Sequence, residues 1–401
     1  MIASRVCLLL LATLFWRGPL GAQVAPAEAE FWSRRDVIIT PSTTALRVRI
    51  GIWDSGVDTT LFAGRLARDG SRRVLVRGYD AFKRRQDSPM QVLPASVLAR
   101  ASELNAVLQA QDELDAGNDS MAAAAIERRL AAMSNAERMV FEDAYGRWAG
   151  YSHGTSVADV AIAGNARAEI VIARMEWWHG SPPVPCWSRE LAHAEAASMR
   201  DLLTWLVASG ARVVNMSWGR FEGSYRRNLE ECAPNMSDAD RRTLARYTVD
   251  TIRAVLRAGI AAAPRVLFVA AAGNAGSTME AENPATRFSL PNLLIVGAVD
   301  RRGAKTAFTN TGPEVGLFAN GDGVAARLVG GLLSHVTGTS IVTPLVAGTA
   351  AKILSVDPSL SGAEVRALLE QTTDTNSTGQ RLLHPARAVQ AARAKVPASR
   401  P

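Results

Sequence analysis

The sequence predicts an α/β protein of three layers, in which a mainly parallel β-sheet is covered by helices on both faces. Short β-branched segments alternate with helical patterns from residue 46 onward, and this alternation is typical of parallel sheets. Asp54, Asn215 and Asn274 lie at the ends of three such segments, and sites in parallel sheets form at the carboxyl ends of strands. With 401 residues, 48% of them hydrophobic, the chain is long enough for one large domain or two ordinary ones.

The first expected strand, residues 46–53, alternates apolar residues with others and leads directly to Asp54. Further strands are expected at Val74–Val76, Ile170–Ala173, Arg212–Met216, Val266–Ala271 and Leu293–Ala298. Helices are expected at 154–163, at about 188–209 and at 241–259.

Residues 90–148 interrupt this alternation. They are rich in Ala, Glu, Arg and Leu and carry no strand signal, and the sequence AGN at 116–118 is typical of a helix end. Ser134 and Glu137 have the spacing of a capping box, which predicts that another helix begins there. We therefore expect two or three helices packed together as an insertion.

The amino-terminal residues 1–22 have the pattern of a secretory signal peptide. The apolar stretch Val6–Trp16 follows a basic residue and is too short to cross a bilayer. We expect cleavage after Ala22 and export to the periplasm or the medium; a buried amino-terminal helix is the alternative. Residues 23–45 then form an N-terminal extension and residues 396–401 a mobile tail.

The charge of the chain argues against a nucleic-acid partner. The net charge of +7 falls to +5 when residues 1–22 are removed, and no basic run is interleaved with aromatic residues. After those residues no segment reaches transmembrane length without a charge, so no membrane span is expected.

Two cysteines, Cys186 and Cys232, remain after signal cleavage. They can pair in an oxidising compartment, and two unpaired buried thiols are the alternative. Because two cysteines without metal-ligand spacing do not indicate zinc, we expect no metal and no cofactor.

Four stretches carry residue types that together suit acyl transfer: Asp54 in IGIWDSGVD, His153 in YSHGTSV, Asn274 in AAAGNAG and Ser340 in TGTSIVTP. A serine hydroxyl is a poor nucleophile until a histidine takes its proton, and the imidazole needs a carboxylate on its other nitrogen. An amide side chain and a backbone N–H can stabilise the oxyanion that forms. Each motif alone also fits a structural role, such as Ser340 capping a helix.

In this order, the motifs DSG, HGT, AAGN and GTSxxTP resemble those of the subtilisin-like serine proteases, the subtilases, over residues 46–395. The resemblance implies a subtilisin-like peptidase domain that acts on protein or peptide substrates. It implies that Asp54 orients His153, which is the general base and acid, and that Ser340 attacks the scissile carbonyl. Asn274 and the backbone N–H of Ser340 would bind the oxyanion.

The resemblance also implies a place for the substrate. The segment VVNMSWG at 213–219 is similar to a strand that lines the S1 pocket of the family. The pocket walls would be formed by Ser217, Trp218 and Gly219 on one side and by Ala271, Ala272 and Gly273 on the other. The floor is expected near Glu282 or Asn283, and Pro344 is expected in the first turn of the helix that Ser340 opens.

The chain departs from the family pattern in its spacing. Asp54 and His153 are 99 positions apart, mostly because of the insertion, and residues 23–45 are too few for a folded pro-domain. We expect the insertion at 90–148 either to border the active-site cleft, limiting access or recruiting a protein partner, or to be a surface decoration remote from the site.

The favoured function is that of a secreted serine endopeptidase. The alternative is a catalytically weak subtilase scaffold that acts as a protein-binding module, although no triad or oxyanion residue is lost. A nucleotide-binding protein is excluded because no G-x-G-x-x-G follows the first strand. The remaining histidines lack a motif and are expected to be surface or structural residues: His179, His193, His335 and His384.

Overall fold

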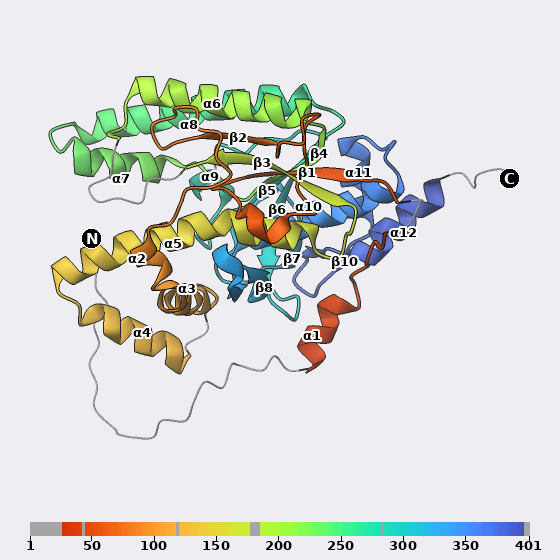
Figure 1. The fold of residues 1–401 in the computed structure, drawn as a ribbon, viewed down its shortest axis with the longest axis horizontal. Helices are drawn as coiled ribbons and strands as arrows, with labels where there is room; N and C mark the ends of the chain where they lie inside the picture. The colour runs from red at the N-terminus through yellow and green to blue at the C-terminus, as the bar shows by residue number, and fades with distance from the viewer. Residues whose placement is uncertain (1–25, 42–44, 118–119, 177–184, 283, 397–401) are drawn as a thin grey trace.

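In the computed structural model of this chain, the described residues are 26–41, 45–117, 120–176, 185–282 and 284–396. The expected signal peptide 1–22 and nearly all of the expected tail lie outside the described residues. The described part of the chain contains a nine-stranded sheet with the order β10-β11-β7-β6-β5-β4-β1-β3-β2 (Figure 1). Its strands are β1 (Val48–Asp54), β2 (Val76–Tyr79), β3 (Ala168–Met175), β4 (Ala211–Met216), β5 (Leu267–Ala271), β6 (Leu293–Val299), β7 (Val315–Asn320), β10 (Asp374–Thr375) and β11 (Arg381–Leu382).

Neighbouring strands are parallel except for the pair β10 and β11, so the predicted mainly parallel sheet is confirmed. The central strands are apolar on both sides; in β5, for example, every residue is buried. This pattern is typical of a parallel sheet that is covered on both faces.

Helices cover the two faces of the sheet and complete the predicted three layers (Figure 1). On one face lie α5 (Asn135–Ile162), α10 (Thr339–Val356), α11 (Gly362–Gln371) and α12 (Pro385–Lys395). On the other lie α6 (Arg189–Ala208), α7 (Glu222–Cys232) and α8 (Asp238–Ala261), with α6 packed directly on β2, β3 and β4. The short helix α9 spans Met279–Glu282.

The structure corrects one predicted strand and adds others. The segment expected at Val74–Val76 begins later, as β2, because Val74 forms an isolated antiparallel bridge with Arg68 instead. β7 was not predicted, and neither was the hairpin of β8 (Val324–Arg327) and β9 (Leu333–Val336), which stands apart from the main sheet. These strands are short and have few β-branched residues, so their alternation of apolar and polar residues is too weak to predict them.

The described part of the N-terminal extension packs against the body of the protein. Its helix α1 (Pro26–Ser33) is held by a hydrogen bond from Trp32 Nε1 to the Asp300 carbonyl. After it, Asp36 pairs with the buried Lys352 Nζ at 2.7 Å. The extension therefore belongs to the folded unit.

The predicted helical insertion is present and leads into a helix of the main domain. It comprises α2 (Ala95–Leu98), α3 (Ala101–Asp115), α4 (Met121–Ala131) and the first half of α5 (Figure 1). α3 ends at the predicted stop, and the predicted capping box of Ser134 and Glu137 opens α5. The insertion is thus continuous with the next helix of the sheet-covering layer.

The helix α10 is long and apolar enough to cross a membrane, the one such helix within the described ranges. However, 83% of its most apolar window is buried inside the protein. Its contacts with β1, β4, β5, β6 and β7 identify it as the central core helix.

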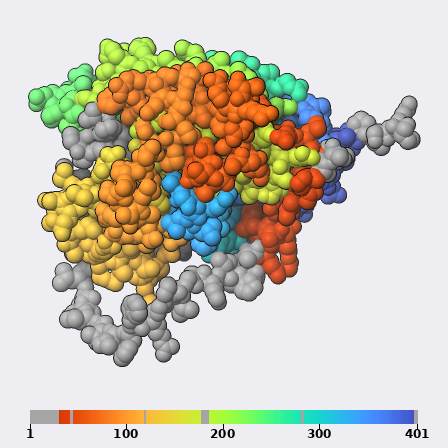
Figure 2. All heavy atoms as spheres, viewed as in Figure 1, coloured from red at the N-terminus to blue at the C-terminus, as the bar shows by residue number. Residues whose placement is uncertain are grey.

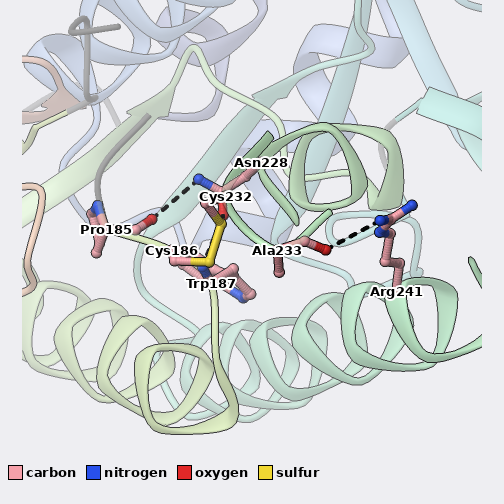
Figure 3. Close-up of a disulfide and its surroundings, with 7 residues drawn as sticks. All are labelled: Pro185, Cys186, Trp187, Asn228, Cys232, Ala233 and Arg241. Carbon is pink, nitrogen blue, oxygen red and sulfur yellow. Dashed lines mark hydrogen bonds between the residues drawn. A yellow bond between two sulfur atoms is a disulfide. The ribbon is translucent and has the colours of Figure 1, made fainter. Parts of the chain in front are cut away.

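Cys186 and Cys232 form a disulfide with an S–S distance of 2.02 Å, so the first of the two alternatives holds (Figure 3). The bond joins the end of α7 to the segment that precedes α6. Asn228 supports this joint, because its Nδ2 donates to the Pro185 carbonyl and its Oδ1 accepts from the Trp187 N–H.

Candidate active site

Asp54 and His153 are brought together directly. Asp54 is the last residue of β1 and is fully buried, and His153 Nδ1 lies 2.8 Å from its Oδ1. The same Oδ1 accepts a hydrogen bond from the Ser55 N–H at 2.7 Å. The carboxylate thus determines which nitrogen of the imidazole faces into the protein, and Nε2 is left to face the other way.

His153 lies well inside α5, whereas the sequence predicted that it stands at the start of a helix. The capping box begins α5 at Asn135, and no proline interrupts the helix before Ile162. At Gly154 the helix approaches the loop after β1 so closely that an added Cβ would lie 2.1 Å from the Gly56 carbonyl oxygen. Glycine at this position therefore brings the His153 backbone within reach of Asp54.

Two opposing effects act on the pKa of His153. Burial lowers it, but the negative charge of Asp54 and the hydrogen bond to it outweigh the burial, with a further contribution from Asp112. The pKa of His153 is therefore raised above its ordinary value. An imidazole with this environment holds a proton more readily than a free one, as a catalytic base must when it takes a proton.

Ser340, Gly338 and Asn274 form a second group of candidate site residues, at the start of α10. Ser340 lies in the first turn of α10, where unpaired N–H groups carry partial positive charge. Gly338 has a φ of 135°, and an added Cβ would lie 3.1 Å from Asn274 Nδ2 and 3.2 Å from Ser340 Oγ. The missing side chain of Gly338 therefore leaves a small space that both polar groups border.

The amide of Asn274 is oriented by its neighbour Thr339. Asn274 Oδ1 accepts hydrogen bonds from the Thr339 N–H at 2.9 Å and from the Thr339 hydroxyl at 2.8 Å. Because the oxygen is used in this way, the Nδ2 donor is turned toward the space beside Ser340. This is the placement that an oxyanion donor requires.

Pro344 lies in the second turn of α10, so its expected place in the first turn is wrong. Proline has no N–H, and the Ser340 carbonyl therefore lacks its usual helical donor. The hydroxyl of Ser217 supplies one instead, at 2.6 Å, and itself accepts a hydrogen bond from Asn215 Nδ2 at 2.9 Å. The strand end at β4 thereby anchors the backbone of Ser340.

A sequence model of the Subtilase family matches residues 47–388. The chain belongs to the subtilase family. The match covers every strand of the nine-stranded sheet and all four motifs of the candidate site, and it ends within α12. Serine protease chemistry is the function that this membership supports.

Relatives of this subtilase include bacterial subtilisins. It is 28% identical over 227 residues to subtilisin amylosacchariticus from Bacillus subtilis subsp. amylosacchariticus, covering 56% of this chain and 51% of that one. It is 31% identical over 170 residues to a subtilisin from Bacillus pumilus, covering 42% and 52%. The matched region thus spans about half the length of these relatives.

Solved structures with the same fold include one from the assembly of subtilase cytotoxin SubAB and one of a lanthipeptide protease. Both have a TM-score of 0.51 and 14% identity; they cover 92% and 86% of this chain, and 94% and 87% of their own. At this identity the likeness shows a shared fold.

Most of the residues expected at the S1 walls of this subtilase have buried side chains. Trp218 is buried and packs against Trp53 with ring centroids 5.1 Å apart, and Ala271 and Ala272 are buried at the end of β5. Ser217 is engaged with the Ser340 carbonyl, as described above. Of the expected floor residues, Glu282 ends α9 and Asn283 lies outside the described residues.

The sequence analysis did not predict the part played by Gly338, the hydrogen bond from Ser217 to the Ser340 carbonyl, or the position of Asp112. The glycine signal was available, because a Gly before Thr-Ser at a helix start predicts a special backbone angle. In the described ranges, no three His, Cys, Asp or Glu side chains gather where they could hold a metal ion.

The remaining histidines that the structure describes lie outside the four site motifs. His193 pairs with the Tyr247 hydroxyl, His335 is exposed in β9, and His384 caps α12. His179 lies outside the described residues.

Proposed function

We propose that this subtilase is an exported serine endopeptidase that hydrolyses peptide bonds with Asp54, His153 and Ser340. The observation that carries the proposal is the 2.8 Å contact between His153 Nδ1 and the buried Asp54 carboxylate. It orients the imidazole as a base whose protonated form is stabilised by a neighbouring charge. Family membership supports the same chemistry.

In the proposed acylation step, the oxygen of Ser340 attacks the scissile carbonyl carbon while His153 takes the hydroxyl proton. The carbonyl oxygen becomes an oxyanion, which Asn274 Nδ2 and the Ser340 N–H stabilise in the space that Gly338 leaves open. His153 then gives the proton to the leaving amine, so the C–N bond breaks and an acyl-enzyme remains.

Deacylation repeats the same proton transfers with water as the nucleophile. His153 takes a proton from water as it attacks the ester carbonyl, and the same donors stabilise the second oxyanion. The proton returns to Ser340, and the carboxylic acid leaves. No cofactor is needed for either step.

Export is the second part of the proposal. It is supported by the signal-peptide pattern at residues 1–22 and by the disulfide of Cys186 and Cys232, since disulfides persist in oxidising compartments. The mature chain then acts in the periplasm or outside the cell.

A scaffold that binds proteins without hydrolysing them is the alternative. The same fold occurs in a solved structure from the assembly of subtilase cytotoxin SubAB. The two functions differ in whether Ser340 is reactive.

A fluorophosphonate probe separates these functions because it forms a covalent bond only with an activated serine. We expect the chain lacking residues 1–22 to be labelled and to hydrolyse a casein substrate, and Ser340→Ala to do neither while melting at the same temperature. Ser277→Ala, in the turn after Asn274, is the matched control and should be labelled normally. An unlabelled wild-type chain that is folded would favour the binding module.

A further inference from the structure

The inserted helix α3 contacts the segment that leads to Ser340. Asp112 Oδ2 accepts a hydrogen bond from the Thr337 N–H at 2.9 Å, and Thr337 directly precedes Gly338. One turn earlier on the same face of α3, Gln109 Nε2 donates to the Ser334 hydroxyl at 3.2 Å. Figure 2 shows the orange insertion against the blue hairpin of β8 and β9.

The other side of this hairpin is held by α5. Arg327 donates from its backbone N–H and from its Nε to Asp159, at 2.9 and 2.8 Å, and Asp159 lies less than two turns after His153. The hairpin therefore lies between the insertion and the helix that carries His153. Its last strand, β9, continues through Thr337 into Gly338 and Ser340.

The charge of Asp112 also acts on His153. The titratable groups whose charges act on Asp112 are Asp115 on α3, His153 on α5 and Asp322 after β7, and its own charge acts on Tyr145 of α5. The interaction with His153 is favourable in both directions: Asp112 raises the pKa of the imidazole, and His153 lowers that of the carboxyl. One side chain of the insertion thus holds the segment before Ser340 by a hydrogen bond and acts on His153 by its charge.

We propose that Asp112 is a positioning residue of the catalytic centre, which holds the backbone before Gly338 through Thr337 and acts on His153 by its charge. The inference rests on the proposed peptidase function and adds to it. It assigns to the insertion a part in the reaction itself.

A carboxyl group at position 112 is costly to ionise, and a hydrogen bond to the Thr337 N–H alone does not require one. Burial raises the pKa of Asp112 to about 7, although the hydrogen bond from Thr337 opposes the shift. An asparagine would accept the same hydrogen bond without the cost of burying a charge. An ionisable carboxyl is the property that only an aspartate adds, and the charge of His153 favours its ionised form.

Two substitutions separate the two roles. Asp112→Asn keeps an oxygen acceptor for Thr337 and removes the charge, so the pKa of His153 should fall. The acid limb of kcat/KM then moves to lower pH, by roughly 0.3–1 unit. Asp112→Ala should show the same displacement and, in addition, a several-fold lower kcat with little change in KM, because the Thr337 N–H loses its partner.

Asp115→Asn is the matched control, since it removes the same charge from the same helix but from an exposed side chain. It should leave the profile within about 0.2 unit of the wild type. Identical profiles for Asp112→Asn and the wild type would overturn the proposal. A displacement of equal size in Asp115→Asn would overturn it as well, because the effect would then be one of general charge.

An NMR titration gives a readout that does not depend on turnover. The imidazole signal of His153, assigned by its loss in His153→Gln, is followed with pH in Ser340→Ala and in Ser340→Ala with Asp112→Asn. We expect a lower pKa in the double variant, and equal pKa values would overturn the proposal. If the wild type hydrolyses nothing, the proposed function fails, and the titration still decides whether Asp112 acts on His153.

Discussion

At the scale of single residues, the candidate site depends on a few atoms around Gly338. Asn274 Nδ2 and Ser340 Oγ border the space where a side chain would stand, and Thr339 holds the amide of Asn274 in place. These hydrogen bonds therefore fix the arrangement of polar groups around Gly338. Three predictions belong to this scale.

Asn274→Ala should lower kcat more than it raises KM, because its donor acts on charge that develops in the transition state. A loss of about 10²–10³-fold in kcat is the size found for such a donor in subtilisin, a family relative and the source of that figure. Steady-state kinetics on a peptide ester checks this. A variant that changes only KM would show that Asn274 binds substrate.

Gly338→Ala should abolish hydrolysis even where the protein still folds. The backbone angle of 135° is unfavourable for alanine, and the methyl group would lie 3.1 Å from Asn274 Nδ2, in the oxyanion space. Gly330→Ala, which is also at positive φ but has open space around it, is the control for strain alone. Equal loss of activity in both variants would argue against a blocked oxyanion space.

Wild-type kcat/KM should rise with pH through a pKa above that of an ordinary histidine. Only neutral His153 can accept the Ser340 proton, and its pKa is raised because the charge of Asp54 outweighs the effect of burial. Activity is therefore lost as pH falls below this raised value. A flat profile between about pH 5 and 8 would contradict the role of His153.

At the scale of helices and strands, α5 and α7 each connect separate parts of the molecule. α5 runs without a break from the insertion to His153 and beyond. α7 is attached at its end by the disulfide to the segment before α6.

The double variant Cys186→Ser with Cys232→Ser should lose about 2–4 kcal/mol of unfolding free energy, since the bond closes a loop of 46 residues. Urea denaturation under oxidising conditions measures the loss. The proposed triad lies in other elements, so kcat of the folded fraction should remain unchanged. A variant as stable as the wild type would show that the disulfide adds no stability.

At the scale of the whole molecule, a buried ion cluster joins three distant segments. Glu195 of α6 pairs with Lys83 Nζ at 3.2 Å and with Arg220 Nε at 2.7 Å, and Arg220 follows the predicted substrate-binding strand. Burial opposes ionisation of Glu195, but the two cations outweigh it and lower its pKa to about 2.

Glu195→Gln should cost about 3–5 kcal/mol at neutral pH, because two buried cations lose their partner. In the wild type the folded pKa is lower than the unfolded one, so this stability is complete above about 4.5 and is lost as pH falls toward about 2. The difference between the two proteins in urea denaturation should therefore shrink over that range. Glu190→Gln, exposed on the same helix, is the control, and a constant difference would contradict the assignment.

The sequence by itself determined the sheet class, the order of the four motifs and the capping of the helix at Ser134. These properties depend on residue types and on spacing within a few turns, which the linear chain displays directly. The recognition of the family followed for the same reason, because the motifs DSG, HGT, AAGN and GTS are short and local.

Only the tertiary structure decided what surrounds the motifs. The Asp112 contact joins residues 225 positions apart, and the contact between Ser217 and Ser340 joins residues 123 apart. No local pattern encodes such neighbours, since they depend on how the sheet order places β4 and α10 and on how the insertion folds back. The length of α5 also depends on packing. Gly154 stays helical within it and lies against Gly56, where a side chain would not fit.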